Sequence, residues 1–301
     1  MIQIENPAKP LQTENFFNQT WKVENELGLV FYQLLGQDSP DTVETKKIIR
    51  ASNHEIARLY PGVSVLQKIA LCPEELYVER FLQKARRFDF DPKPWIDWSE
   101  GDNDIVGEVD KVFCIRVGAK FESSGDKERF YAHELGHPYS SSVSPIFDPI
   151  GGEILLADTE GLVEADARIA LEIQARDDMK FSRDFITSLK DNELATPKEV
   201  GISGYDHSAF INKTVSLNPG YASCFLWFLG QAVRAGKRGN GDVSLKNQYL
   251  RGRGKLLDIA KRSSTKVEYK ELLLAELGFD YDREAKSTSF LNETRQLLLS
   301  L

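Results

Sequence analysis

Residues 130–140 read FYAHELGHPYS, and this stretch decides how the rest of the chain is interpreted. It contains two of the chain's four histidines, His133 and His137, with Glu134 directly after the first. Residues four positions apart lie on one face of a helix, so both imidazoles can bind a single metal ion. A chance HExxH motif is rare in a chain with so few histidines. The motif therefore predicts a metal site on a helix.

Zinc is the metal that this motif favours. Neutral imidazole nitrogens suit zinc, which in catalytic sites takes three protein ligands and a water molecule. The metal lowers the pKa of that water toward ~7 and polarises a carbonyl oxygen. A carboxylate beside the water can take up a proton and return it to the leaving amine. The motif therefore predicts Zn²⁺ as the cofactor, His133 and His137 as ligands, and Glu134 as general base and acid.

A third ligand has to come from another part of the chain, because Val143 stands six residues after His137, where some HExxH proteins have a third histidine. The stretch TEGLVEADARIALE (residues 159–172) offers Glu160 and Glu164, one helical turn apart on the same face. A carboxylate from this second helix can complete the site. The alternative for both glutamates is a solvated helix face.

The two stretches together resemble the glutamate-zincin (gluzincin) metallopeptidases, which pair an HExxH helix with a second helix reading roughly E-G-[LFW]-A-[DE]. Here EGLVE fits that pattern, with Val163 in place of the small residue. The resemblance implies Glu160 as the third ligand. It also implies that Glu164 is the supporting carboxylate that accepts the other N–H of a ligand histidine. It covers only residues 130–168, and it implies a zincin-like fold and peptide-bond hydrolysis.

A second register of the same helix is also open. Glu164-Ala165-Asp166 is similar to the E-A-N/D stretch of small regulatory metallopeptidases related to phage-repressor cleavage. In that register Glu164 binds the metal, and Asp166 or Arg168 supports it. We favour Glu160, because only the first register places a supporting carboxylate one turn beyond the ligand.

Pro138 directly follows the second histidine. Proline lacks an N–H, clashes with the carbonyl four residues back and disfavours a helical conformation of the residue before it. The sequence therefore predicts that the helix ends or kinks at His137. The chain is then expected to continue into a Ser-rich loop up to Gly152, with Tyr139 close to the site.

A peptide-cleaving zinc site usually adds a donor that stabilises the developing oxyanion. Tyr139, Tyr205 and His207 are the candidates, and the last two belong to the segment GYDH at residues 204–207. The alternative for that segment is a simple turn. Tyr205 and His207 are thus predicted as further catalytic residues.

The hydrophobic patterns along the chain predict an α+β fold, mostly helical with a small antiparallel or mixed sheet. The predicted regions are a helical N-terminal region over residues 1–100, a zincin-like catalytic core over 101–215 and a helical C-terminal lobe over 216–301, unless the chain is one continuous domain. Helices are expected over residues 15–36, 39–60, 72–88, 158–176 and 219–236, followed by three amphipathic helices in the last ~60 residues. Residues 111–121 read as one strand, either an edge strand that pairs with an extended substrate or an interior strand.

Composition narrows the class of protein. The net charge of -8 argues against general nucleic-acid binding, and no apolar run approaches the ~20 residues that span a bilayer. Cys72, Cys114 and Cys224 are far apart in apolar surroundings, which predicts buried reduced thiols. The region from Arg234 to Lys266 is rich in Lys and Arg. It is expected to be a solvated basic face, with binding of an acidic partner as the alternative.

Two functional hypotheses follow, and both leave the oligomeric state open. The first is a zinc metallopeptidase, a hydrolase of the endopeptidase type acting on a protein or peptide substrate. The second is a non-catalytic or regulatory metal-stabilised module that binds proteins through a peptidase-like core. The N-terminal sequence lacks a secretory signal pattern, which predicts action in a cytoplasm. The alternative is export without a cleaved signal peptide, as a secreted effector.

Overall fold

The structure is a computed structural model, and it describes residues 21–26, 28–34, 39–88, 101–106, 110–118, 124–147, 156–172, 183, 186–187, 194–200, 217–237 and 244–300. By its internal packing the chain forms two compact units. The first, Met1–Ala51 with Ser64–Ser124, contains the sheet and is called the sheet unit. The second, Ser52–Val63 with Gly125–Leu301, is called the helical unit. The helical unit contains His133, His137 and Glu160 together with the C-terminal helices.

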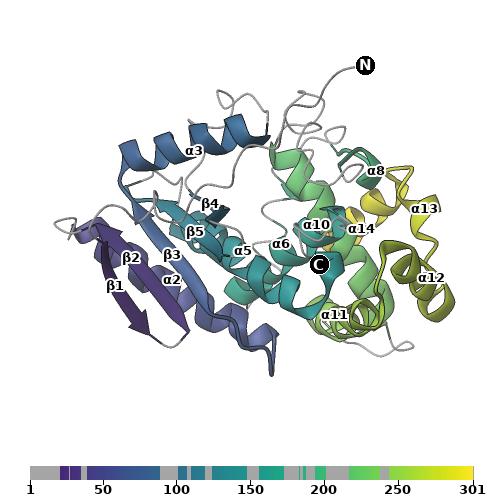
Figure 1. Cartoon of the computed structure of the whole chain (residues 1–301). Coiled ribbons are helices and arrows are strands. Elements are labelled where there is room, and N and C mark those ends of the chain that lie inside the picture. Colours follow the sequence, from purple (N-terminus) through teal and green to yellow (C-terminus); the bar gives the residue numbers. More distant parts are fainter. Residues whose placement is uncertain are drawn as a thin grey trace, which may run out of the picture. The chain divides into compact units, whose positions relative to one another are not determined.

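The sheet unit is built on a mixed five-stranded sheet with strand order β1-β2-β3-β5-β4 (Figure 1). The outer pairs β1–β2 and β4–β5 are antiparallel, and the inner pairs β2–β3 and β3–β5 are parallel. The strands are β1 (Trp21–Glu26), β2 (Leu29–Leu34), β3 (Gln67–Cys72), β4 (Gly101–Val106) and β5 (Asp110–Arg116), and the helices α2 (Pro40–Leu59) and α3 (Glu74–Phe88) connect the parallel strands. The expected mostly helical α+β architecture with a small mixed sheet is confirmed.

The predicted helix over residues 15–36 is wrong where the structure describes it. Strands β1 and β2 form a hairpin there, and Gly28 turns the chain with a φ of 85°, which a residue with a Cβ rarely adopts. The run LVFYQL is rich in β-branched and aromatic residues, and its pairing with β3 buries Phe31 completely. A short apolar run fits both the hydrophobic period of a helix and that of a strand, and the pairing with β3 decides in favour of the strand. The helical content expected for residues 1–100 is accordingly too high.

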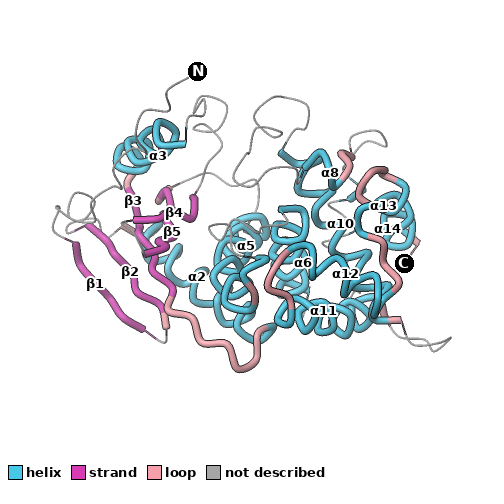
Figure 2. The backbone as a smooth tube through the Cα atoms, turned by 45° about the vertical axis from the view of Figure 1, so that its right-hand side comes forward, coloured by secondary structure: helices cyan, strands magenta, loops and turns pink. Residues whose placement is uncertain are grey.

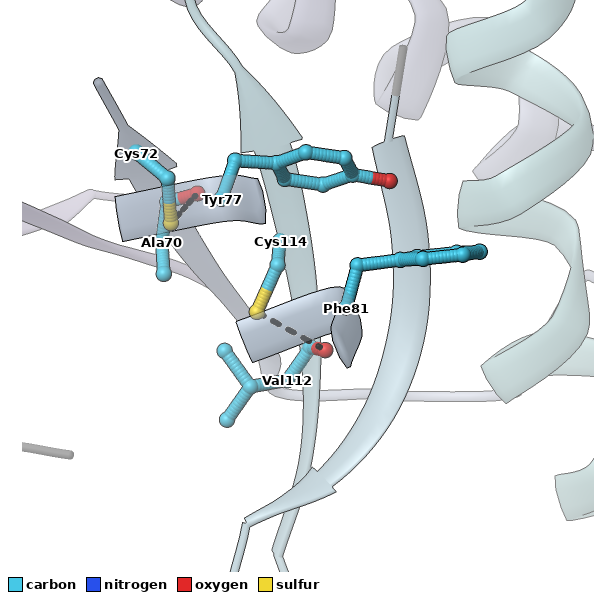
Figure 3. Packing of buried hydrophobic residues seen from close by; sticks show 6 residues of the cluster. All are labelled: Ala70, Cys72, Tyr77, Phe81, Val112 and Cys114. Atoms are coloured by element: carbon cyan, nitrogen blue, oxygen red, sulfur yellow. Dashed lines mark hydrogen bonds between the residues drawn. The ribbon is translucent and has the colours of Figure 1, made fainter. Parts of the chain in front are cut away.

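The two faces of the sheet are covered by different helices. On one face Cys72 and Cys114 pack with Tyr77 and Phe81 of α3 (Figure 3). On the other face Phe31 lies beneath cationic side chains of α2, with Lys46 Nζ 5.7 Å from its ring centroid. Cys72, Cys114 and Cys224 are all free and buried, as their apolar surroundings predict.

Strand β5 is an interior strand, so the edge-strand alternative for residues 111–121 is wrong. Residues Phe113–Ile115 pair with β3 on one side and with β4 on the other. Their main chain therefore offers no open edge along which a substrate peptide could pair. Strand β4 was not predicted, because its sequence GDNDIV starts with glycine, acids and asparagine, which strands disfavour.

The helical unit is organised around α10 (Leu217–Gly236), which packs against α6 (Leu156–Glu172), α11 (Leu245–Arg262) and α14 (Ser289–Leu299) (Figure 2). Residues 222–233 of α10 are buried all round, as its nearly continuous apolar sequence predicts. The other elements are α5 (Ser124–Val143), η1 (Pro145–Phe147), α8 (Pro197–Val200), α12 (Lys266–Leu277) and α13 (Tyr281–Glu284). None of the helices that the structure describes is long and apolar enough to cross a membrane.

Helix α5 continues through Pro138 to Val143, so the predicted helix end at His137 is wrong, and residues 138–143 are helix where a loop was expected. A proline removes only one hydrogen bond of the helical ladder, and the serine hydroxyls after it bond back to carbonyls of the preceding turn. Ser140 Oγ donates to the carbonyl of His137 at 2.9 Å, and Ser142 Oγ donates to that of Pro138 at 2.7 Å. The serines that suggested a loop therefore belong to the last turns of the helix.

Candidate metal centre

Helices α5 and α6 bring the two histidines and one glutamate to a common point. Nε2 of His133 lies 3.2 Å from Oε2 of Glu160, and Nε2 of His137 lies 3.8 Å from the same oxygen. One potential ligand atom from each of the three residues lies within 4.8 Å of the others. Two atoms that each bind a tetrahedral zinc at about 2.1 Å lie about 3.4 Å apart. The donor set and its spacing therefore fit a zinc ion.

Glu164 contacts the opposite side of the His133 ring. Its Oε2 lies 2.9 Å from Nδ1, whereas Glu160 faces Nε2. A carboxylate at Nδ1 favours the tautomer with the proton on that nitrogen, which leaves the Nε2 lone pair available to a metal. Of the two registers, this geometry favours Glu160 as the ligand and Glu164 as its support.

Two arginines hold the buried carboxylate of Glu164. Arg129 Nη1 donates to its two oxygens at 3.0 and 3.2 Å, and Arg168 Nη2 contacts Oε1 at 2.6 Å. Burial raises the pKa of Glu164, but the charges of Arg129 and Arg168 and the contact with His133 outweigh burial and hold that pKa well below its usual value. Glu164 is therefore ionised, with hydrogen bonds to Arg129 and His133 and an ion pair with Arg168.

The electrostatics at His133 favour a positive charge at this point. Burial lowers the pKa of His133, but hydrogen bonds to Glu160 and Glu164 and the charges of these carboxylates raise it to about 10. The same two carboxylates attract a divalent cation, which competes with the proton for Nε2.

Close helix contacts depend on two glycines within the predicted motifs. A Cβ on Gly136 of HELGH would lie 3.3 Å from the side chain of Val163, so the glycine leaves room for this valine. A Cβ on Gly161 of EGLVE would lie 2.2 Å from the carbonyl oxygen of Cys224 in α10. Only glycine therefore allows α6 to approach α10 this closely, directly beside Glu160.

Buried Asp158 anchors the start of α6. It accepts hydrogen bonds from Trp227 Nε1 and Gln231 Nε2 of α10, both at 3.1 Å, and from the Tyr281 hydroxyl. These donors are neutral, and burial raises the pKa of Asp158 although the three hydrogen bonds lower it. This anchor was not predicted, because its partners are 69 to 123 residues away in sequence.

Asp166 anchors the later part of the same helix. Arg253 of α11 forms a two-pronged ion pair with it, both contacts at 2.6 Å, and the Tyr249 hydroxyl adds a third at 2.6 Å. Arg253 Nη1 also donates to the carbonyl of Leu59 at 2.8 Å, and the guanidinium stacks over Tyr60. Asp166 therefore holds α6 in place. Of the two supports that the alternative register allowed for Glu164, Arg168 contacts it, and the bonds of Asp166 run to Arg253 and Tyr249.

The basic stretch of α11 is only partly the solvated face that its sequence predicts. Arg253 is buried against Asp166. Arg251 and Lys255 extend to the end of α10, where Arg251 Nη2 donates to Gly236 O at 3.1 Å and Lys255 Nζ to Ala235 O at 2.7 Å. Basic groups at these carbonyls satisfy the acceptors that a helix C-terminus leaves open.

The predicted catalytic residues differ in how far the structure describes them. Glu134 is half-buried on α5, directly after His133. Tyr139 is buried, donates to Asn53 Oδ1 at 3.3 Å and stacks on Tyr60, so its hydroxyl already has a partner on α2. Tyr205 and His207 lie outside the described residues.

Comparison with models of known protein families gives no match for this chain. Comparison with curated proteins gives no match either. The functional interpretation therefore depends on the residues and geometry of the site itself.

Proposed function

We propose that this protein is a zinc-dependent metallopeptidase of the gluzincin type that hydrolyses peptide bonds of a protein substrate. One observation carries the proposal: His133 and His137 of an HExxH helix converge with Glu160 of a second helix, at distances that fit a tetrahedral metal. The contact between Glu164 and Nδ1 of His133 adds the carboxylate that zinc-binding histidines usually have.

Each residue has a defined task in this proposal. His133, His137 and Glu160 hold the zinc, which when bound acidifies a water and polarises a carbonyl oxygen. Glu134 takes a proton from the attacking water and delivers it to the amine that leaves. Glu134 is half-buried on α5 and directly follows the candidate ligand His133. Glu164 keeps Nδ1 of His133 protonated throughout.

The test combines metal analysis with a substitution of Glu134. The purified chain should contain stoichiometric zinc by elemental analysis, and a diverse peptide library followed by mass spectrometry should reveal cleavage. Glu134→Gln should keep its zinc and lose about 10²–10⁴-fold in cleavage rate, because only the proton transfer is removed. Glu128→Gln, the same change on the same helix outside the candidate site, is the matched control.

The outcomes separate the two hypotheses. Cleavage by the Glu134→Gln variant at the wild-type rate would overturn the mechanism. Stoichiometric zinc without cleavage of any library peptide would favour the metal-stabilised interaction module. A folded preparation, never exposed to chelators, that contains no zinc would overturn the metal site and the peptidase proposal with it.

A further inference from the structure

The contacts around Glu164 go beyond what is needed to support a histidine. The side chain is fully buried, and its carboxylate is contacted by one imidazole and two guanidinium groups. The arginines come from both metal helices, Arg129 one turn before His133 on α5 and Arg168 one turn after Glu164 on α6. The carboxylate therefore lies at the junction of the two helices that carry the ligands.

We propose that Arg129 and Arg168 are positioning residues that fix the Glu164 carboxylate against Nδ1 of His133 and thereby set the metal affinity of the site. This inference rests on the proposed zinc site. A buried carboxylate has about four acceptor positions, and the hydrogen bond from His133 occupies only one of them. The guanidinium groups occupy others, so the carboxylate is held on both sides.

The geometry explains why two arginines are suited to this task. Arg168 contacts Oε1, which leaves Oε2 directed at the histidine, and Arg129 bridges both oxygens. Arg168 is itself fixed, because it is buried and its guanidinium lies over the ring of Phe225 at 5.5 Å. A planar, delocalised guanidinium suits such a position better than a lysine ammonium. Without these contacts the carboxylate can rotate away from Nδ1.

Zinc affinity is the measurement that isolates this role, and chelator competition on refolding-competent, metal-stripped protein provides it. We expect Arg168→Gln and Arg129→Gln each to weaken zinc binding by about 10–100-fold, the range found when groups that orient a metal ligand are removed. Arg168→Lys should lose less zinc affinity than Arg168→Gln, because lysine keeps the positive charge but lacks the planar guanidinium. Arg251→Gln is the matched control, because Arg251 lies on α11 and contacts Gly236 O.

A double-substitution cycle tests whether the arginine acts through the carboxylate. Glu164→Gln alone should weaken zinc binding, and adding Arg168→Gln to it should cause no further weakening, because residues that act through one contact are not additive. Independent, multiplying losses would overturn the inference. Arg129 is partly exposed, with 29% of its side chain accessible, so Arg129→Gln keeps the test decisive even if Arg168→Gln does not fold.

The failure of this inference differs from the failure of the proposed function. If the wild type binds zinc tightly and both arginine variants bind it equally well, the positioning role is wrong and the zinc site stands. If the wild type does not bind zinc, the proposed function is wrong and the positioning role is wrong with it. If Arg251→Gln weakens zinc binding as much as Arg168→Gln does, the effect is general and the inference is overturned.

Discussion

Gly161 offers the sharpest test of how α6 is placed. A Cβ at this position would lie 2.2 Å from the carbonyl oxygen of Cys224 and 2.8 Å from Cβ of Phe228. The first distance falls about 1.2 Å short of the 3.4 Å at which ordinary van der Waals contact begins. The obstacle is backbone of a buried helix, so it cannot rotate aside as a flexible side chain would.

The expected effect of Gly161→Ala on stability follows from two opposing contributions. Forcing one methyl group into a packed interior costs up to about 3 kcal/mol in typical cases. Replacing glycine by alanine inside a helix favours folding by about 1 kcal/mol. We therefore expect a net loss of about 2 kcal/mol in the free energy of unfolding. Glu160 is the adjacent residue, so its displacement should also weaken zinc binding.

The assay is urea unfolding followed by circular dichroism, with a chelator present so that metal binding does not contribute to stability. The matched control is Gly254→Ala, a change in the interior of α11 where an added Cβ meets no atom within 4 Å. The control should gain about 0.5–1 kcal/mol from helix propensity. If Gly161→Ala gains as much as the control, α6 and α10 do not approach as closely as described and the packing argument is wrong.

Three further predictions concern other ionic groups. Arg253→Met should lower the free energy of unfolding in urea by about 3–5 kcal/mol, because it leaves Asp166 buried without its ion pair. Adding Asp166→Leu should recover most of this loss, and no recovery would contradict the pairing. Asp158→Asn should lower the free energy of unfolding by about 1–3 kcal/mol in the same assay, because one carboxylate oxygen that accepts hydrogen bonds becomes an NH₂ group facing another donor. An unchanged free energy of unfolding would count against this anchor. Hydrogen bonds from Lys46 and Lys22 lower the pKa of Glu24 to about 2, so the stabilisation from this carboxylate is complete above its unfolded-state pKa and is lost as pH falls toward 2. Lys46→Met should raise the pKa of Glu24 in an NMR titration, and an unchanged pKa would refute the contact.

The sequence predicted the elements whose pattern is long and regular. The sequence of α2 has a cap-type start and a break before Pro61, and α10 has a nearly continuous apolar sequence. The hairpin of β1 and β2 was missed, because a short apolar run such as LVFYQL fits the hydrophobic period of a helix as well as that of a strand. The extension of α5 past Pro138 was missed because it includes the packing of Tyr139 on Tyr60, a tertiary contact.

The sequence predicted that His133, His137 and Glu160 lie together, but it did not predict the surroundings of this cluster. Spacing groups His133 with His137 and Glu160 with Glu164, since i, i+4 pairs share a helix face. The choice of Glu160 as the ligand is what the resemblance to the gluzincins implies. The roles of Arg129 and Arg253 do not follow from spacing. Each contacts a partner on another helix, and such pairs become adjacent only when the helices pack. Oxyanion donors remain predictions, because Tyr205 and His207 lie outside the described residues.

The acids of α6 differ in function because they face different partners. Glu160 and Glu164 meet imidazoles of α5, whereas Asp158 and Asp166 project from the opposite face and meet donors of α10, α11 and α13. Contacts on one face of a helix fix its rotation about its axis, and because both faces share one rigid backbone, they also fix the direction of the side chains on the other face. The C-terminal helices, which looked like a separate lobe from the sequence, therefore determine where Glu160 points. In this chain the arrangement of the candidate ligands His133, His137 and Glu160 therefore depends on the core packing behind α6 as well as on the HExxH motif.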